Sequence, residues 1–200
     1  MAKFKYNRRN AEYTHSNGKA VQPQTINQWV MDSIDAAKDS LRNDAQRMAD
    51  KKLSVNAWRD KMREHIRAGH RNMAKLAYGP ELSPKQLGRL GAIVKAQYKY
   101  LDNFVAGIKN KSVSRESSVS RSLLYLDALW ATFQNELRRA KKDAGFTTCV
   151  NILNEEADNC TECPELTDKG EIPIDDMPMI GMRKCSIGCR CSIEYFRPAS

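Results

Sequence analysis

Long apolar runs are missing from this sequence. No stretch approaches the ~20 consecutive apolar residues that a membrane-crossing helix needs, and the N-terminal sequence MAKFKYNRRN lacks the apolar run of a signal peptide. We therefore expect a protein that is made and used without secretion and has no membrane partner. In a reducing cytoplasm, closely spaced cysteines hold metal more often than they form disulfides.

The motifs of common enzyme classes are also missing. The chain has no G-x-x-x-x-G-K-[ST], G-x-G-x-x-G or G-x-S-x-G pattern, the patterns that cradle phosphates or present a nucleophilic serine. His65 and His70 are five residues apart, whereas a zincin helix needs a spacing of four, so we expect both on the surface or partly packed. Glu162 and Glu165 beside a cysteine pair disfavour a reactive thiolate. The sequence predicts a protein that is not an enzyme.

Aromatic residues are scarce, at 8% of the chain, while charged residues make up 28%. This composition is typical of a soluble protein rich in surface helix. The net charge is unevenly divided, because residues 149–200 carry −5 and residues 1–148 carry +14. A basic body can lie against phosphate or an acidic partner, although a solvated surface with a basic bias explains the charge equally well.

Apolar residues recur every three or four positions between residues 23 and 148, which predicts amphipathic helices. The expected helices run from Pro23 to Met48, from Ser54 to the Gly79–Pro80 stop, from Pro84 to Ile108 behind a Ser83–Gln86 cap, and from about Ser114 to Lys142 with Gly145 just past the end. We predict a mainly α protein, with long amphipathic helices in a bundle or an elongated array. Residues 1–22 would form an extended basic arm, residues 23–148 the basic helical body, and residues 149–200 an acidic, cysteine-rich zinc module poor in regular structure.

All six cysteines lie in the last 52 residues. Two short-spaced groups, Cys160-x-x-Cys163 and the run Cys185 to Cys191, are what a tetrahedral thiolate zinc site needs. The intervening loop has little periodicity, so bound metal would supply the stability that an apolar core lacks. Five cysteines compete for four places: the spacing favours Cys160, Cys163, Cys185 and Cys189, and Cys191 either replaces Cys189 or lies just outside the shell. Cys149 fits a buried apolar position, and disulfides are the competing interpretation of the cluster.

The cysteine segments resemble the C-terminal module of the Mu F-like head morphogenesis proteins, which are minor head proteins of tailed phages. The residues that carry the resemblance are Asp158–Leu166, Ile174–Pro178, Gly181 and Cys185–Cys191, with an acidic residue before C-x-x-C, a following leucine, a loop ending in Pro and Gly, and a terminal C-R-C. Many family members have His-Pro-Asn before the C-R-C, where this chain has Cys185 four residues before Cys189. A thiolate in place of histidine is thus an open ligand choice.

This resemblance implies a structural virion component of the phage head that acts in capsid or portal assembly and in genome packaging or delivery. It also implies portal and capsid proteins as partners in a multi-subunit assembly, with the host cytoplasm as the place of assembly. The basic body can contact packaged DNA without sequence specificity. The alternative hypothesis is a zinc-containing, nucleic-acid-binding regulatory protein, and an enzyme that uses its cysteines is the third.

Overall fold

The computed structural model describes residues 4–198, which divide into two compact units. Of the described residues, unit 2 comprises 32–72 and 82–129, and unit 1 comprises 4–31, 73–81 and 130–198. Compactness thus groups the chain differently from the predicted ranges 1–22, 23–148 and 149–200, and those limits stay predictions. Both units take part of their structure from long helices.

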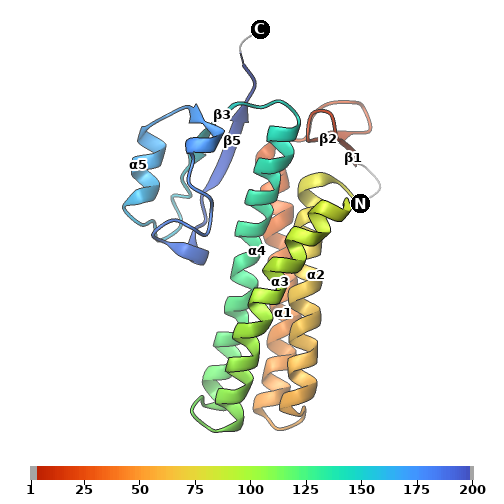
Figure 1. Cartoon of the computed structure of the whole chain (residues 1–200), viewed down its shortest axis with the longest axis vertical. Helices are drawn as coiled ribbons and strands as arrows, with labels where there is room; N and C mark the ends of the chain where they lie inside the picture. The colour runs from red at the N-terminus through yellow and green to blue at the C-terminus, as the bar shows by residue number, and fades with distance from the viewer. Residues whose placement is uncertain (1–3, 199–200) are drawn as a thin grey trace. The chain divides into compact units, whose positions relative to one another are not determined.

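Four long helices make the protein mainly α, as the sequence predicts (Figure 1). They are α1 (Pro23–Ala49), α2 (Val55–Tyr78), α3 (Pro84–Lys109) and α4 (Arg115–Asp143). Each bound lies within a residue or two of the expected one, because capping residues and glycines mark the ends. None of the helices in the described part of the chain is long and apolar enough to cross a membrane.

Within unit 2 the four helices form a bundle in which a side-chain contact joins each neighbouring pair. These contacts are Lys38 with Asp127 at 2.6 Å (α1 and α4), Asp44 with His65 at 3.2 Å (α1 and α2), Arg63 with Asp102 at 2.9 Å (α2 and α3), and the rings of Phe104 and Tyr125 with centroids 6.3 Å apart (α3 and α4). The contacts close a ring of four helices, which is the arrangement of a four-helix bundle. The bundle alternative is therefore the one observed.

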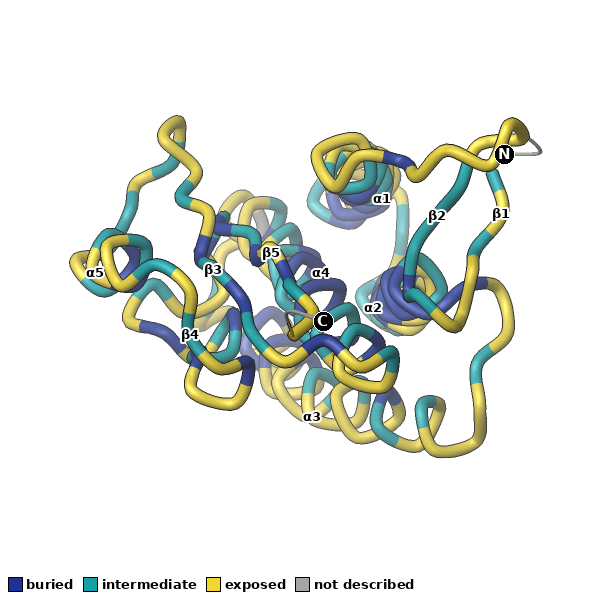
Figure 2. The backbone as a smooth tube through the Cα atoms, turned by 90° about the horizontal axis from the view of Figure 1, so that it is seen from above, coloured by how far each residue is buried: buried dark blue, intermediate teal, exposed yellow. Residues whose placement is uncertain are grey.

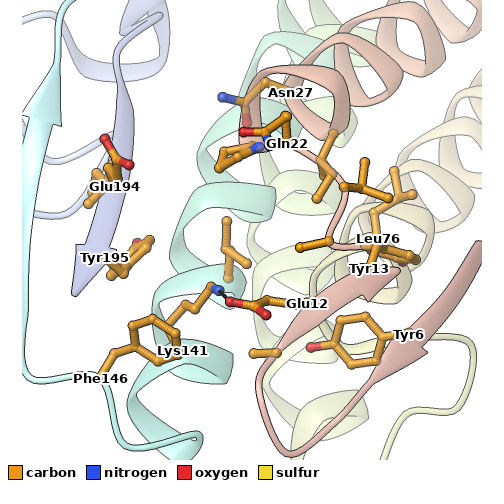
Figure 3. Close-up of a pocket in the computed structure, with 17 residues that line it drawn as sticks. Tyr6, Glu12, Tyr13, Gln22, Asn27, Leu76, Lys141, Phe146, Glu194 and Tyr195 are labelled. Carbon is orange, nitrogen blue, oxygen red and sulfur yellow. Dashed lines mark hydrogen bonds and ion pairs between the residues drawn. The ribbon is translucent and has the colours of Figure 1, made fainter. Parts of the chain in front are cut away.

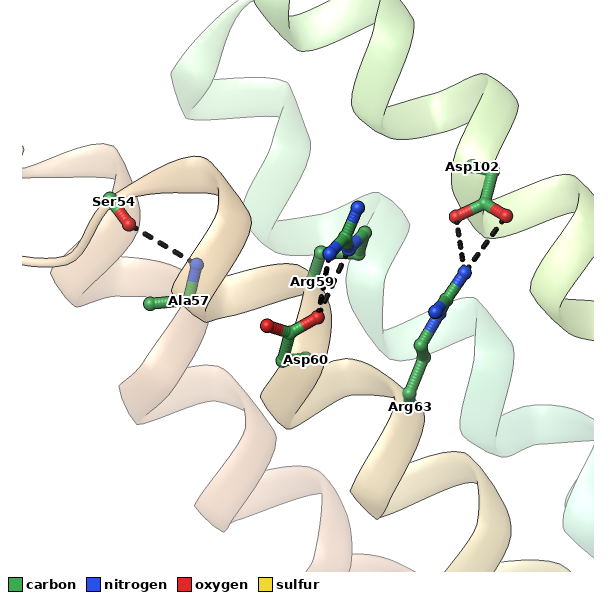
Figure 4. Close-up of polar contacts among 6 residues, drawn as sticks. All are labelled: Ser54, Ala57, Arg59, Asp60, Arg63 and Asp102. Carbon is green, nitrogen blue, oxygen red and sulfur yellow. Dashed lines mark hydrogen bonds and ion pairs between the residues drawn. The ribbon is translucent and has the colours of Figure 1, made fainter.

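Side-chain caps fix where two of these helices begin. The Ser83 hydroxyl accepts a hydrogen bond from the Gln86 amide, and the Gln86 side chain accepts one from the Ser83 amide, so the predicted capping box is confirmed. At the start of α2, the Ser54 hydroxyl accepts from the Ala57 amide at 3.2 Å (Figure 4). Both caps satisfy amides that have no partner inside the helix.

The core of unit 2 follows the predicted apolar stripes. Buried positions recur along one side of each helix and exposed positions along the other (Figure 2). Trp58, Met62 and Ile66 are fully buried, whereas Leu87 near the start of α3 is 43% exposed. His70 is fully buried, so the prediction that it lies on the surface or is partly packed is wrong. It continues the Ile66 stripe one helical turn further along α2.

Unit 1 begins with a hairpin where the sequence predicts an extended arm. Strands β1 (Phe4–Asn7) and β2 (Glu12–His15) pair antiparallel, and the Tyr6 hydroxyl donates to the carbonyl of Ala77 at 2.7 Å. The ring of Phe4 lies 4.5 Å from that of Trp29. Strands of four residues leave too short an alternation to detect in a sequence.

The C-terminal part of unit 1 holds a small antiparallel sheet with the order β4-β3-β5 (Figure 2). Its strands are β3 (Thr148–Ile152), β4 (Ile172–Pro173) and β5 (Ser192–Phe196), and one short helix, α5 (Glu162–Asp168), packs on β3. The register pairs Thr148 with Phe196 and Ile152 with Ser192. The segment between β3 and β5 also buries Leu166, Ile174, Met177 and Ile180, so it has more apolar packing than its low periodicity suggests.

Candidate metal centre

Two chain turns present the cysteines. In the first turn the Cys163 amide donates to the carbonyl of Cys160 at 3.2 Å, directly at the start of α5. In the second, the Gly188 amide donates to the carbonyl of Cys185 at 3.0 Å and the Cys189 amide donates to that of Ser186. Such turns aim two sulfur atoms in the same direction, which is the property of a metal-binding knuckle.

The sulfur atoms of the two turns converge although 21 residues separate them in sequence. The Sγ of Cys163 lies 3.6 Å from that of Cys160, 3.5 Å from that of Cys185 and 4.0 Å from that of Cys189. All six cysteines are free thiols, and these separations far exceed the ~2.05 Å of a disulfide bond. The structure therefore brings together the cysteines that the spacing singled out.

The sulfur separations fit a metal ion. Four thiolates around one ion at ~2.3 Å stand at the corners of a tetrahedron with edges of ~3.8 Å, and the three observed distances from Cys163 bracket this value. In each of two groups, three sulfur atoms lie within 4.8 Å of one another. The first group is Cys160, Cys163 and Cys185, and the second is Cys163, Cys189 and Cys191. The cluster can therefore hold a metal ion.

Cys163 belongs to both sulfur groups and is the centre of the cluster. Its Sγ lies 3.5 Å from that of Cys185 and 4.0 Å from that of Cys189, and Cys189 and Cys191 form the second group with it. The shell expected from the spacing, Cys160, Cys163, Cys185 and Cys189, takes its fourth sulfur from this second group, and Cys191 is the alternative. The ligand set stays a prediction.

The thiols of the cluster differ in acidity. A hydrogen bond from Cys191 is the largest cause that lowers the pKa of Cys189 to about 5. Burial raises the pKa of Cys160, but hydrogen bonds from Cys185 and Cys163 outweigh it and lower that pKa to about 7. By contrast, the hydrogen bond with Cys189, together with burial, raises the pKa of Cys191. Thiolate is the form that binds metal, but burial also raises the pKa of Cys163 and of Cys185, so acidity does not separate ligands from neighbours in this cluster.

Cys149 is fully buried in β3 and lies outside both sulfur groups. Burial raises its pKa to about 11. This thiol is a core residue, as the sequence predicts. His15, His65 and His70 likewise belong to neither group.

Two polar residues that the sequence did not single out lie against the cluster. Arg183 is 3% exposed, and its Nη1 donates to Asn151 Oδ1 at 2.7 Å and lies 3.9 Å from Cys189 Sγ and 4.0 Å from Cys163 Sγ. Asn151, fully buried in β3, donates to the carbonyl of Cys163 at 3.1 Å. A lone arginine or asparagine has no spacing signal, so only the position of Arg183 two residues before Cys185 hints at this role.

Helix α4 supports the loop between α5 and Cys185. The guanidinium of Arg138 donates to the carbonyls of Ile174 and Met177 at 2.6 and 2.8 Å, and Asn135 donates to that of Ile180 at 2.9 Å. These bonds engage carbonyls of the loop, including that of Ile174, which also accepts from the Met177 amide. The loop is therefore held at its backbone independently of the cysteines.

Unit 1 also contains a cavity of about 230 Å³ away from the cysteines (Figure 3). Its most buried charge is Lys141, which lies 3.5 Å from Glu12 and 4.3 Å from the ring centre of Phe146. Burial lowers the pKa of Lys141, and Glu12 opposes this effect. Because the ammonium group already has an acidic and an aromatic partner, this cavity is a weaker candidate site than the cysteine cluster.

No protein-family model matches this chain, and no curated protein or solved structure matches it.

Proposed function

We propose that the cysteine cluster is a structural zinc site. The observation that carries this proposal is the convergence of four sulfurs from two distant turns at separations of 3.5 to 4.0 Å around Cys163. An all-sulfur tetrahedral site suits zinc or iron, and zinc is the common ion where the role is structural. Four protein ligands leave no position for water or substrate, so the centre stabilises the fold and performs no reaction.

Elemental analysis of the purified full-length chain, alongside a count of reactive thiols, tests the zinc site. The expected result is one equivalent of zinc per chain, with the thiols of the cluster unreactive until a chelator is added. One equivalent of iron with a coloured protein would reassign the ion. Metal-free protein with all thiols reactive would contradict the proposal.

The chain as a whole is proposed to be a minor head protein of a tailed phage, with portal and capsid proteins as its partners. The resemblance of the cysteine segments supports this role, and a chain that has both a helical bundle and a metal-stabilised module suits a subunit of a larger assembly. Unit 2 holds 18 Lys/Arg and 10 Asp/Glu, which is compatible with non-specific contact to packaged DNA. Presence of the chain in purified particles at a fixed ratio to portal would support the role, and presence only in infected-cell lysate would contradict it.

The basic charge of unit 2 also supports a second candidate function, that of a zinc-containing nucleic-acid-binding regulator. A regulator binds one sequence far more tightly than others, whereas phosphate contacts alone discriminate little and weaken steeply with salt. Binding of the isolated chain to random and selected duplexes over a range of salt concentrations separates the two. Sequence-selective binding that persists at physiological salt would favour the regulator.

A further inference from the structure

We propose that Arg183 is a positioning residue of the metal–thiolate centre. Its positive charge offsets the excess negative charge of the sulfurs, and it does not bind the ion. The inference rests on the proposed metal site and adds to it a residue that binds no metal itself. Its starting point is an arginine side chain buried beside sulfur atoms.

The partners of Arg183 are all uncharged unless the thiols are ionised. Its guanidinium donates to the carbonyl of Pro178 and to Asn151 Oδ1, approaches the Met177 sulfur at 3.4 Å, and faces the sulfurs of Cys163 and Cys189. No carboxylate pairs with it within residues 4–198. A buried cation without a counter-ion is strongly unfavourable. The neighbouring thiolates are the groups that can supply the missing negative charge.

The charge of the proposed centre matches this need. Four thiolates around a divalent ion carry a net charge of −2, and the guanidinium reduces the buried total to −1. Arginine N–H groups directed at metal-bound sulfur also stabilise the thiolate form, as outer-shell donors do at other metal sites. Burial of the four-sulfur centre and burial of the arginine therefore each cost less free energy when both are present.

Arg183 contacts one cysteine from each turn. Cys163 comes from the first turn and Cys189 from the second, and both are buried, at 1% and 2% exposure. Cys160 and Cys185 complete the shell on its more exposed side. The guanidinium therefore joins the two turns on the inner side of the centre, where water cannot stabilise the sulfur charge.

Asn151 fixes the direction of the guanidinium. Its Oδ1 accepts from Arg183, while its Nδ2 donates to the carbonyl of Cys163 and to Thr167 Oγ1 at 2.9 Å. The amide is thus fully engaged and oriented by β3 and α5. This support makes the position of the charge a property of the folded module rather than of a flexible side chain.

The test compares Arg183→Lys and Arg183→Gln with the wild-type full-length chain. Zinc affinity is measured by competition with a chromogenic chelator, and Co²⁺ is used as a spectroscopic substitute. Loss of the charge in R183Q should weaken zinc binding by 10–100-fold, the usual effect of removing an outer-shell partner, while R183K should restore most of it. In R183Q the sulfur-to-cobalt charge-transfer band should move to lower energy, because sulfur that has lost its N–H donors gives up electrons more readily.

Arg138→Gln is the matched control, because Arg138 holds carbonyls of the same loop but contacts none of the cluster sulfurs. It should lower stability while leaving the cobalt band in place. An R183Q protein with wild-type zinc affinity and an unshifted band would overturn the inference, and so would R183K binding zinc no better than R183Q. If R183Q fails to fold, R183K decides the matter: its ammonium keeps the charge but not the fork of N–H donors to both sulfurs, so its cobalt band should move slightly to lower energy, and an unshifted band in R183K would overturn the inference. Absence of zinc binding by the wild-type chain would instead overturn the metal site itself.

Discussion

The indole Nε1 of Trp130 donates a hydrogen bond to the carbonyl oxygen of Cys191 at 2.9 Å. Trp130 lies on α4 and is 4% exposed, and Cys191 is fully buried. The last cysteine of the chain is thus fixed through its backbone, while its thiol lies beside the proposed metal shell. This single contact connects α4 to the residue that directly precedes β5.

Replacement of Trp130 by phenylalanine should lower stability by about 1–2 kcal/mol beyond the loss of ring volume, because the buried carbonyl of Cys191 loses its donor. Trp58→Phe is the control, since the Trp58 indole N–H is buried without a hydrogen-bond partner within the described residues. Denaturant unfolding of both variants, loaded with zinc, measures the difference. Equal destabilisation would mean that the Trp130 hydrogen bond contributes nothing.

Replacement of individual cysteines by serine should separate ligands from neighbours. Cys160→Ser should abolish tight zinc binding, because a hydroxyl is a poor zinc ligand, whereas Cys191→Ser should retain one equivalent. Metal content after dialysis against a weak chelator measures the outcome. Retention by C160S together with loss by C191S would assign the shell to the other sulfur group.

Gly181 has a φ of +90°, and a Cβ added there would lie 3.1 Å from the Cβ of Ala131. Gly181→Ala should therefore combine backbone strain with a steric clash and cost roughly 2–3 kcal/mol. Gly170→Ala should cost only about 1 kcal/mol, since its φ of +65° is also positive but no neighbour among the described residues lies within 4 Å of its added Cβ. Thermal unfolding of the two zinc-loaded variants provides the comparison, and a G170A variant as unstable as G181A would exclude the clash with Ala131.

His70 should make unit 2 sensitive to acid. Burial lowers its pKa from 6.5 to about 4, and a hydrogen bond with Gln97 opposes this effect. Between these two pH values the unfolded chain binds a proton that the folded chain does not, so stability is retained above pH 6.5 and falls as the pH drops toward 4. The loss should total roughly 3 kcal/mol.

Urea unfolding at pH 7 and pH 4 measures this effect in the wild type and in His70→Gln. The variant should show a smaller loss of stability between the two pH values, even if it is less stable at pH 7. His15→Gln, at an exposed position, serves as the control and should keep the wild-type difference. An unchanged pH dependence in H70Q would show that other groups cause the acid sensitivity.

Local signals in the sequence were sufficient for the helices. Ser83 and Gln86 cap α3 as expected, and Gly145, with a φ of +85°, follows the end of α4, where the Phe146 amide donates to the carbonyl of Lys141. These signals act over a few residues, so they can be recognised without knowledge of the fold. The convergence of the cysteine turns was also predictable, because their short spacings have a known geometric purpose.

The sheet and the partners of the cluster could not be predicted in this way. Strand β3 pairs with β5, which lies some forty residues later, and five-residue strands of mixed burial leave no clear alternation. Arg183 reads as one more basic surface residue until the fold buries it. The burial of His70 was missed for a related reason. A polar side chain predicts an exposed position, although His70 continues an apolar stripe.

The pairing of Ile152 with Ser192 has a kinetic consequence. All five clustered cysteines lie between these two residues, so the sheet already holds together both ends of the segment that receives the ion. Loss of the ion would release the two cysteine turns but not the ends of this segment or the carbonyls that α4 holds. The entropy required to bring the ends together again would therefore not be needed for rebinding. Metal exchange in this protein should therefore resemble the opening and closing of a tethered loop, with α4 and the strand pair remaining in place throughout.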